Sequence, residues 1–283
     1  METWVSSSTK KVIIGGGQPT VLIGERINPA GKKKLAEALK RGNLDAISND
    51  AIAQVHAGAD IIDVNVATFG VDELVMLPRV LQVVMDAVDV PLSIDSNNPK
   101  ALEASLKVYR GKPIINSVTG EEHSLRNILP LVKEYEATVI GLTQDDEGIP
   151  NNSARRVAIA RKIIEQAEKM GIPRHDIIID CLASAVGADP AAGIVAIETA
   201  RHIRSEMGVN LTIGASNISF GLPNREILNC TFVAMVIVAG VTCLIVDVGK
   251  VRPFVLAADL ALGNDKHARR YVESYRQSKK NCS

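Results

Sequence analysis

The sequence predicts a single-domain α/β protein of the (β/α)8 type, a TIM barrel, and three observations predict it. Short apolar runs rich in Val and Ile alternate with longer segments whose apolar residues recur at helical spacing. Eight such runs are present, whereas a doubly wound sheet in a chain of 283 residues usually has fewer strands. Most runs end in an acid or an amide, the place where barrels carry ligand-binding side chains. A doubly wound sheet stays the alternative.

The chain divides into three expected segments. Residues 1–19 join a polar stretch to the apolar run 11–14 and three glycines, and we interpret them as a lead-in hairpin or tail at the bottom of the domain. The glycines are not followed by Gly-Lys-Ser/Thr, so no phosphate-binding loop is expected. Residues 20–263 form the barrel, and the polar residues 264–283 form a C-terminal surface helix or a tail.

The barrel elements follow from the apolar pattern. The expected strands are residues 20–25, 60–66, 91–95, 113–118, 137–143, 176–181, 210–216 and 242–248. The expected helices are residues 46–56, 73–87, 99–109, 124–135, 153–170, 190–207 and 225–238. One junction shows the construction clearly: Asp95 closes an apolar run, Asn98 suits a helix N-cap and Pro99 suits the first helical position. Asp95 therefore lies at the strand-to-helix rim, where parallel α/β proteins bind ligands.

The composition argues against several kinds of partner. Basic and acidic residues number 32 each, so the formal net charge is zero and nothing favours nucleic acid or an acidic membrane. No apolar run reaches the length of a membrane span, and residues 1–10 lack the apolar core of a signal peptide. No CxxC pair occurs, so we expect reduced thiols in a cytoplasmic protein. The cysteines are Cys181, Cys230, Cys243 and Cys282.

Polar residues gather where the expected strands end. They are Glu25, Asn28, Asp63, Asn65, Asp95, Asn116, Thr143, Asp180, Asn217 and Asp247. Helix capping favours Asp and Asn in the same places and accounts for some of them. It accounts less well for Asp63, Asp95 and Asp180, which lie inside their apolar runs, so we expect these side chains to point into the barrel mouth. Carboxylates and amides with few histidines and no metal-ligand spacing suit a neutral heterocycle such as a pterin, and no bound metal is predicted.

Seven segments carry a resemblance to a known family. They are Gly-Glu-Arg-Ile-Asn at 24–28, Asp-Val-Asn-Val at 63–66, Ile-Asp-Ser-Asn-Asn-Pro at 94–99, Ile-Asn-Ser at 115–117, Ile-Gly-Leu-Thr at 140–143, Ile-Asp at 179–180 and Gly-Ala-Ser-Asn-Ile-Ser at 214–219. In this order, from about residue 21 to about residue 262, the chain resembles the pterin-binding methyltransferases. Among them it looks most like the methyltetrahydrofolate:corrinoid (iron-sulfur) protein methyltransferases of anaerobic bacteria.

The resemblance implies a set of pterin- or folate-binding residues. They are Glu25, Asp63, Asn65, Asp95, Asn116, Asp180, Asn217 and Arg225. By this likeness Asp95, Asn116 and Asp180 would hold the pterin ring, with Asp180 facing its 2-amino/N3 edge. Asp63 and Asn65 would support that site.

Two further residues gain a role from the resemblance, and one departs from it. Asn217 would be the catalytic residue, because its amide would reach N5, the nitrogen that carries the methyl group. Arg225 would pair with the carboxylates of the folate tail, unless it is only a surface arginine at a helix start. Phe220 stands where the family leads us to expect a polar glutamine, which would alter the hydrogen bonding around N5.

The expected function is likewise what the resemblance implies. The chain would move a methyl group between N5 of tetrahydrofolate (or 5-methyltetrahydrofolate) and the cobalt of a corrinoid, in either direction, in anaerobic one-carbon metabolism. Its five histidines lack the Asp-x-His-x-x-Gly context of a cobalamin site, so a separate corrinoid protein would bring the cobalt in a transient complex. A homodimer is also expected.

Other readings stay open. Dihydropteroate synthase, a relative on the same barrel, needs phosphate-binding groups; the Arg-x-His pattern is missing after the last strand, but Lys250 and Arg252 keep this reading open. A non-catalytic pterin-binding protein is a second alternative. A third is an unrelated barrel enzyme that uses Lys or a metal, against which no expected strand ends in Lys.

Overall fold

Eight parallel strands form the wall of a barrel in the computed structural model, which describes residues 1–281. The strands, in spatial order, are β10 (Cys243–Val246), β3 (Val21–Ile27), β4 (Ile61–Asn65), β5 (Leu92–Asp95), β6 (Ile114–Thr119), β7 (Thr138–Leu142), β8 (Ile177–Asp180) and β9 (Asn210–Thr212). Backbone hydrogen bonds from Thr242 N to Leu211 O (3.0 Å) and from Ile245 N to Ile213 O (3.1 Å) join β9 to β10. The predicted (β/α)8 barrel is therefore confirmed.

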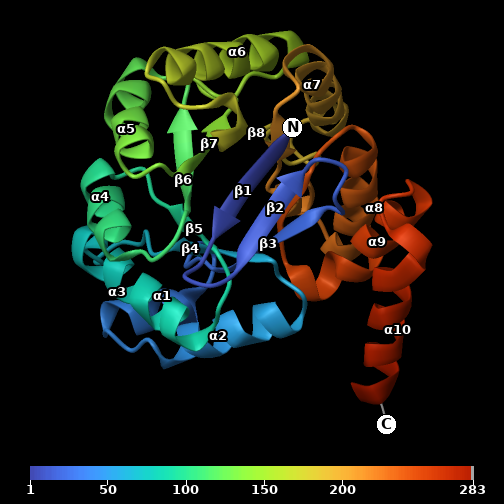
Figure 1. Cartoon of the computed structure of the whole chain (residues 1–283), viewed down its shortest axis with the longest axis horizontal. Coiled ribbons are helices and arrows are strands. Elements are labelled where there is room, and N and C mark those ends of the chain that lie inside the picture. The colour runs from blue at the N-terminus through green and yellow to red at the C-terminus, as the bar shows by residue number, and fades with distance from the viewer. Residues whose placement is uncertain (282–283) are drawn as a thin grey trace.

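A helix follows every strand of the barrel and covers its outer face (Figure 1). The helices are α1 (Lys33–Lys40), α2 (Asp45–His56), α3 (Glu73–Ala87), α4 (Pro99–Val108), α5 (Glu122–Glu134), α6 (Ser153–Lys169), α7 (Ala192–Met207), α8 (Arg225–Val238), α9 (Val248–Ala261) and α10 (Arg269–Asn281). Three short 3-10 helices accompany them: η1 (Arg174–Asp176), η2 (Ala215–Ser219) and η3 (Lys266–Ala268). In Figure 1, α10 extends away from the barrel.

The sequence prediction missed the helices α1 and α9 and placed the ends of the strands β9 and β10 too late in the chain. Helix α1 was missed because its lysine-rich start reads as a loop, and only Leu35 and Leu39 turn inward. The strand expected to reach residue 248 ends at Val246, and Val248 already opens α9. The strand expected at 210–216 stops at Thr212, after which the chain turns into η2.

The junction after β5 forms as its sequence predicts. Asn98 caps α4: its Oδ1 accepts hydrogen bonds from the backbone N–H groups of Lys100 (3.1 Å) and Ala101 (3.4 Å). Pro99 occupies the first helical position. Asp95 is the last residue of β5, so the rim position expected for it is the one it occupies.

Side chains inside the barrel change from apolar to polar along the strands. The apolar inward layer consists of Val21, Ile23, Ile61, Ile114, Ile140, Ile178 and Cys243. Because successive side chains of a strand alternate between its faces, the next inward positions on four of these strands are acids or an amide. These upper positions are Glu25, Asp63, Asn116 and Asp180.

An antiparallel hairpin of β1 (Glu2–Ser6) and β2 (Lys11–Gly15) covers the lower end of the barrel. Its Val5, Val12 and Ile14 pack against the apolar inward layer. Figure 1 shows the two strands crossing this end of the barrel. The division into segments 1–19, 20–263 and 264–283 stays a proposal.

Two further findings concern the state of the cysteines and the length and hydropathy of the helices. Cys181, Cys230 and Cys243 are buried free thiols, and Cys282 lies outside the described residues. Within residues 1–281, no helix is both long enough and apolar enough to cross a membrane.

Candidate functional site

Three of the predicted site residues form one row at the upper end of the barrel. Asn65 on β4 is in register with Asp95 on β5, which is in register with Asn116 on β6. All three line a cavity of about 480 Å³ that continues over the start of α5 and the loop after β7. This volume lies in the range of small-molecule sites.

Asp63 stands behind this row instead of lining the cavity. It is only 3% exposed, and its Oδ1 accepts a hydrogen bond from Nδ2 of Asn116 at 3.0 Å. This bond fixes the orientation of the Asn116 amide, because an amide that donates from Nδ2 to Asp63 has its oxygen on the other side. Burial raises the pKa of Asp63. Burial, with the neighbouring Asp63 carboxylate as a further cause, raises the pKa of Asp95 well above its ordinary value.

Asp180 lies at the end of β8, next to the wall of the cavity but not in it. It is in register with Leu142, which does line the cavity. Its Oδ1 accepts a hydrogen bond from the backbone N–H of Leu182 (2.7 Å), which turns that oxygen toward its own loop. The side chain is almost fully buried, and burial raises the pKa of Asp180 to about 7.

Arg156, which the sequence analysis did not single out, fixes the loop after Asp180. The guanidinium is 2% exposed and donates to the backbone oxygens of Pro150 (2.8 Å), Cys181 (2.9 Å) and Leu182 (2.6 Å). A charged group on the buried face of a helix is the signal that the sequence offered, because such a group needs partners in the core. Arg156 therefore holds the backbone that binds Asp180.

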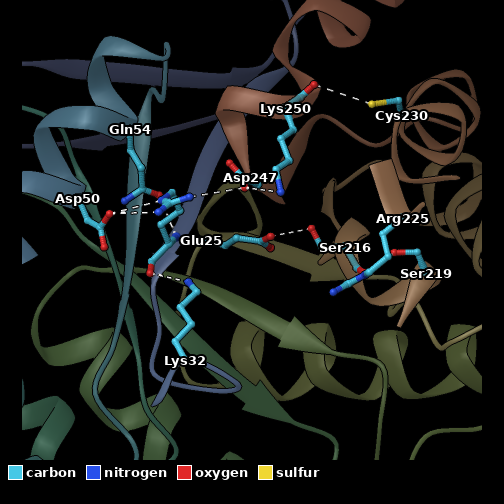
Figure 2. Close-up of polar contacts among 11 residues, drawn as sticks. Glu25, Lys32, Asp50, Gln54, Ser216, Ser219, Arg225, Cys230, Asp247 and Lys250 are labelled. Carbon is cyan, nitrogen blue, oxygen red and sulfur yellow. Dashed lines mark hydrogen bonds and ion pairs between the residues drawn. The ribbon is translucent and has the colours of Figure 1, made fainter. Parts of the chain in front are cut away.

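The opposite side of the mouth, over β3, β9 and β10, consists of charged groups that pair with one another (Figure 2). Arg26 contacts Asp50 at 3.3 Å and Asp247 at 3.8 Å, and Lys250 lies 3.5 Å from Asp247. Lys32 donates to the backbone oxygen of Arg26 at 2.7 Å. These contacts leave few charges on this side open to a ligand.

Glu25 and Arg225 lie on this paired side and line a separate cavity of about 160 Å³. Glu25 accepts a hydrogen bond from Oγ of Ser216 at 2.6 Å, and burial raises the pKa of Glu25. Arg225 donates from Nε to Oγ of Ser219 (2.9 Å) and from Nη2 to the backbone oxygen of Ser216 (2.7 Å). The two residues therefore contact the same short segment, η2.

Asn217 is part of η2 and lines neither cavity. Its backbone N–H donates to Gly214 O at 3.2 Å, but its side chain is exposed and has no hydrogen-bond partner within residues 1–281. An amide with free donor and acceptor groups is available to a ligand.

The structure thus divides the expected single ring of residues. Asn65, Asp95 and Asn116 share the larger cavity with Asp63 behind them. Glu25 and Arg225 belong to the smaller cavity, and Asp180 and Asn217 stand between the two. Within residues 1–281, no cluster of three His, Cys, Asp or Glu side chains is arranged to hold a metal ion.

Two relatives of known activity are similar to most of this chain. The methylcorrinoid:tetrahydrofolate methyltransferase of Eubacterium limosum is 32% identical over 266 residues, which are 92% of this chain and 97% of that protein. Methionine synthase of Mycobacterium tuberculosis is 30% identical over 265 residues, which are 89% of this chain but only 22% of the synthase.

Solved structures share the fold. DHPS (dihydropteroate synthase) of Yersinia pestis, determined with a pterine-sulfa conjugate, superposes with a TM-score of 0.73 at 16% identity and covers 92% of this chain and 99% of that one. At this identity the likeness concerns the fold alone. Residues 24–247 match the pterin binding enzyme family, and the resemblance expected from the strand-end motifs is confirmed. The chain belongs to the pterin binding enzymes.

Proposed function

We propose that this protein is a methyltransferase that moves a methyl group between the cobalt of a separate corrinoid protein and N5 of tetrahydrofolate. The single observation that carries the proposal is the end-to-end similarity to the methylcorrinoid:tetrahydrofolate methyltransferase of Eubacterium limosum. That similarity favours the methylcorrinoid as methyl donor and tetrahydrofolate as acceptor.

The larger cavity gives the pterin ring its place in this proposal. Asp95 and Asn116 offer an acid and an amide oxygen to ring N–H groups, and Asn65 closes the row. A carboxylate that accepts two parallel hydrogen bonds suits the 2-amino/N3 edge of the ring, and we assign Asp180 to that edge. Its Oδ1 would then accept hydrogen bonds both from the Leu182 N–H and from the ring. Each hydrogen bond to a charged group contributes about 1.5–3 kcal/mol, so a few of them orient a bicyclic ring.

Asn217 is the residue that we assign to N5. Transfer to tetrahydrofolate forms an N5–CH3 bond with the N5 lone pair, breaks the cobalt–carbon bond with both electrons left on cobalt, and releases the N5 proton. The amide of Asn217 cannot take that proton, so it orients N5 and stabilises its changing charge while water accepts the proton. Its side chain is free for this role within the described residues.

The ion pairs on the β3–β10 side of the mouth argue against a synthase that binds pyrophosphate there. Two basic groups on this side already face acids: Arg26 contacts Asp50 and Asp247, and Lys250 contacts Asp247. Arg252, the other basic residue named for this alternative, donates to the Ser274 hydroxyl at 2.7 Å. Glu25 lines the same small cavity. An incoming phosphate would meet these negative charges, which disfavours the dihydropteroate synthase alternative.

A second copy of the chain and a reducing compartment complete the proposal. Ile227 and Val238 on α8 are 65% and 60% exposed, and Met235 on α8 and Phe254 on α9 are exposed as well. An exposed apolar face of this kind marks an interface, and we assign it to a homodimer, which sedimentation or light scattering measures. The buried free thiols suit the cytoplasm.

The test combines the purified protein with tetrahydrofolate and a methylated corrinoid protein. We expect the cobalt spectrum to change as 5-methyltetrahydrofolate accumulates. Condensation of a pterin pyrophosphate with aminobenzoate would identify a synthase instead. Tight folate binding without any cobalt change, for a panel of corrinoid proteins, would indicate a non-catalytic pterin-binding protein.

A further inference from the structure

The segment that carries Asn217 is held from two sides, by a strand and by a helix (Figure 2). From β3, Glu25 accepts the hydroxyl hydrogen of Ser216 at 2.6 Å. From the first position of α8, Arg225 donates to the backbone oxygen of Ser216 and to the hydroxyl of Ser219. Asn217 lies between these anchored residues, and its side chain makes no hydrogen bond within the described chain.

The chain between η2 and α8 bends so that Arg225 returns to the segment it has just left. Gly221 and Asn224 both adopt left-handed backbone conformations, with φ of 78° and 47°. Glycine adopts this conformation without a steric cost, and asparagine is among the residues that tolerate it. The guanidinium carbon of Arg225 ends 6.0 Å from the centre of the Phe220 ring. The guanidinium therefore lies over the Phe220 ring at the outer limit of a cation–π contact.

Two kinds of contact fix η2 in place. Ala215 and Ile218 are fully buried and anchor the segment to the core. The hydrogen bonds of Glu25 and Arg225 act above that anchor, on the residues that flank Asn217 in the sequence, and so fix the rotation of the turn. Hydrogen bonds from a charged guanidinium are stronger than neutral ones, which makes Arg225 an effective holder, and the Glu25 oxygen accepts the Ser216 hydroxyl beside it.

We propose that Glu25 and Arg225 are positioning residues that hold Asn217 over the pterin site, and that they do not bind the folate. This inference rests on the proposed function, because it gives Asn217 its role at N5. The donor groups of Arg225 at Nε and Nη2 are already used by η2, and the Oε1 of Glu25 by Ser216. Side-on binding of a tail carboxylate through Nε and Nη2 would require both of these hydrogen bonds to break.

The two roles of Arg225 predict different responses to the folate tail. With Arg225→Ala we expect kcat to fall roughly ten- to a hundredfold, as misplaced catalytic groups cause, and KM to stay within several-fold. The fall is equal for tetrahydrofolate and for a tetrahydropterin that lacks the aminobenzoyl-glutamate tail. A loss that affects only the tailed substrate would overturn the proposal. The matched control is Arg174→Ala, which removes another two-donor arginine that faces Glu168 on the surface.

Glu25 offers a conservative rescue. Glu25→Gln keeps an oxygen that accepts the Ser216 hydroxyl, so most activity remains, whereas Glu25→Ala removes it. Ser216→Ala should reproduce the loss of Glu25→Ala, and the double variant should lose no more than either alone, because both remove one contact. Full additivity would show that Glu25 acts without Ser216 and would contradict the proposal.

Hydrogen exchange separates this inference from the proposed function. The backbone amides of Asn217 and Phe220 donate within the turn, to Gly214 and Asn217. In Arg225→Ala these amides should exchange faster while the melting temperature stays that of the Arg174→Ala control. Faster exchange in a protein without methyl transfer would reject the proposed function and keep the positioning role. Unchanged exchange in an active protein would reject the positioning role.

Discussion

The two sides of the barrel mouth use the same residue types in opposite ways. On the β4–β6 side, Asp95 and Asn116 face a large cavity, and Asp63, which supports them, is paired with an amide. On the β3–β10 side, Glu25 and Asp247 face hydroxyl and basic groups of the protein itself. The strand-end acids of the first side have acids and amides of the same row as neighbours and still line a large cavity, whereas those of the second side meet hydroxyl and basic groups that occupy them.

The largest effect that we expect falls between the two sides, at Asn217. Asn217→Ala should slow methyl transfer by about two orders of magnitude, the usual cost of removing a donor that acts on changing charge. Folate affinity, measured by fluorescence or calorimetry, should stay within several-fold because the cavity residues are intact. If binding collapses instead, Asn217 is a ring anchor.

A change on the open side should act on affinity. Asn116→Ala removes a cavity amide from the ligand, and it also leaves the buried Asp63 without its donor, which lowers the stability of the free and the bound protein alike by about 1–3 kcal/mol. We expect tetrahydrofolate to bind more than tenfold more weakly, as about 1.4 kcal/mol implies. Calorimetry gives the affinity and thermal melting checks the fold. Unchanged affinity would exclude Asn116 from the ring site and would break the comparison.

Asp180, at the end of β8 beside the larger cavity, should add a pH dependence to pterin binding. Its pKa of about 7 means that the free protein holds the acid neutral below that pH, while the ring edge needs the carboxylate. Pterin affinity should therefore rise with pH up to about 7 and level off above it, falling about tenfold per unit below. Asp180→Asn should bind weakly at every pH, and a pH profile that this variant retains would assign the dependence to another group.

The same shift has a consequence for stability. A carboxyl whose pKa is raised in the folded state favours folding in its neutral form, so its contribution to the free energy of unfolding is lost as pH rises through about 7. Asp180→Asn should raise the melting temperature more at about pH 8 than at about pH 5. Such a loss of stability is expected where a binding site keeps a buried carboxylate because the ligand needs it.

The smallest effect should come from the paired side. Asp247→Asn removes one charge from partly exposed contacts with Arg26 and Lys250, and exposed ion pairs contribute about 0–1 kcal/mol. We expect tetrahydrofolate affinity and kcat within about fivefold of the wild type, the factor to which about 1 kcal/mol corresponds. A tenfold loss of affinity would show that this side also binds the substrate and would remove the distinction between the two.

The sequence predicts the strands and their polar ends because both are local patterns. The strand end at Asp95 and the helix start at Asn98 and Pro99 can be predicted from residues 91–99 alone. The pairing is not local: Glu25 meets Ser216, 191 positions later. No spacing rule predicts that contact, since it depends on how the barrel closes.

The misplaced elements have a similar cause. Val248 continues an apolar run in the sequence, but the helix α9 begins there because its inward-facing neighbour Asp247 ends the strand at the rim. Likewise, Asn217 follows an apolar run that the strand β9 does not use to its end. Which part of a run pairs is decided by the neighbouring strand.

The β1–β2 hairpin below the barrel limits the directions from which substrates can reach the site. Val5, Val12 and Ile14 fill the lower end of the barrel, so in the proposed reaction the folate and the cobalt of the partner would both approach the upper end. A pterin bound in the cavity beside Asp95 would be covered by a corrinoid protein that docked over the mouth. In the proposed reaction the folate would therefore have to enter before the corrinoid protein, and its product could leave only after that protein had moved away.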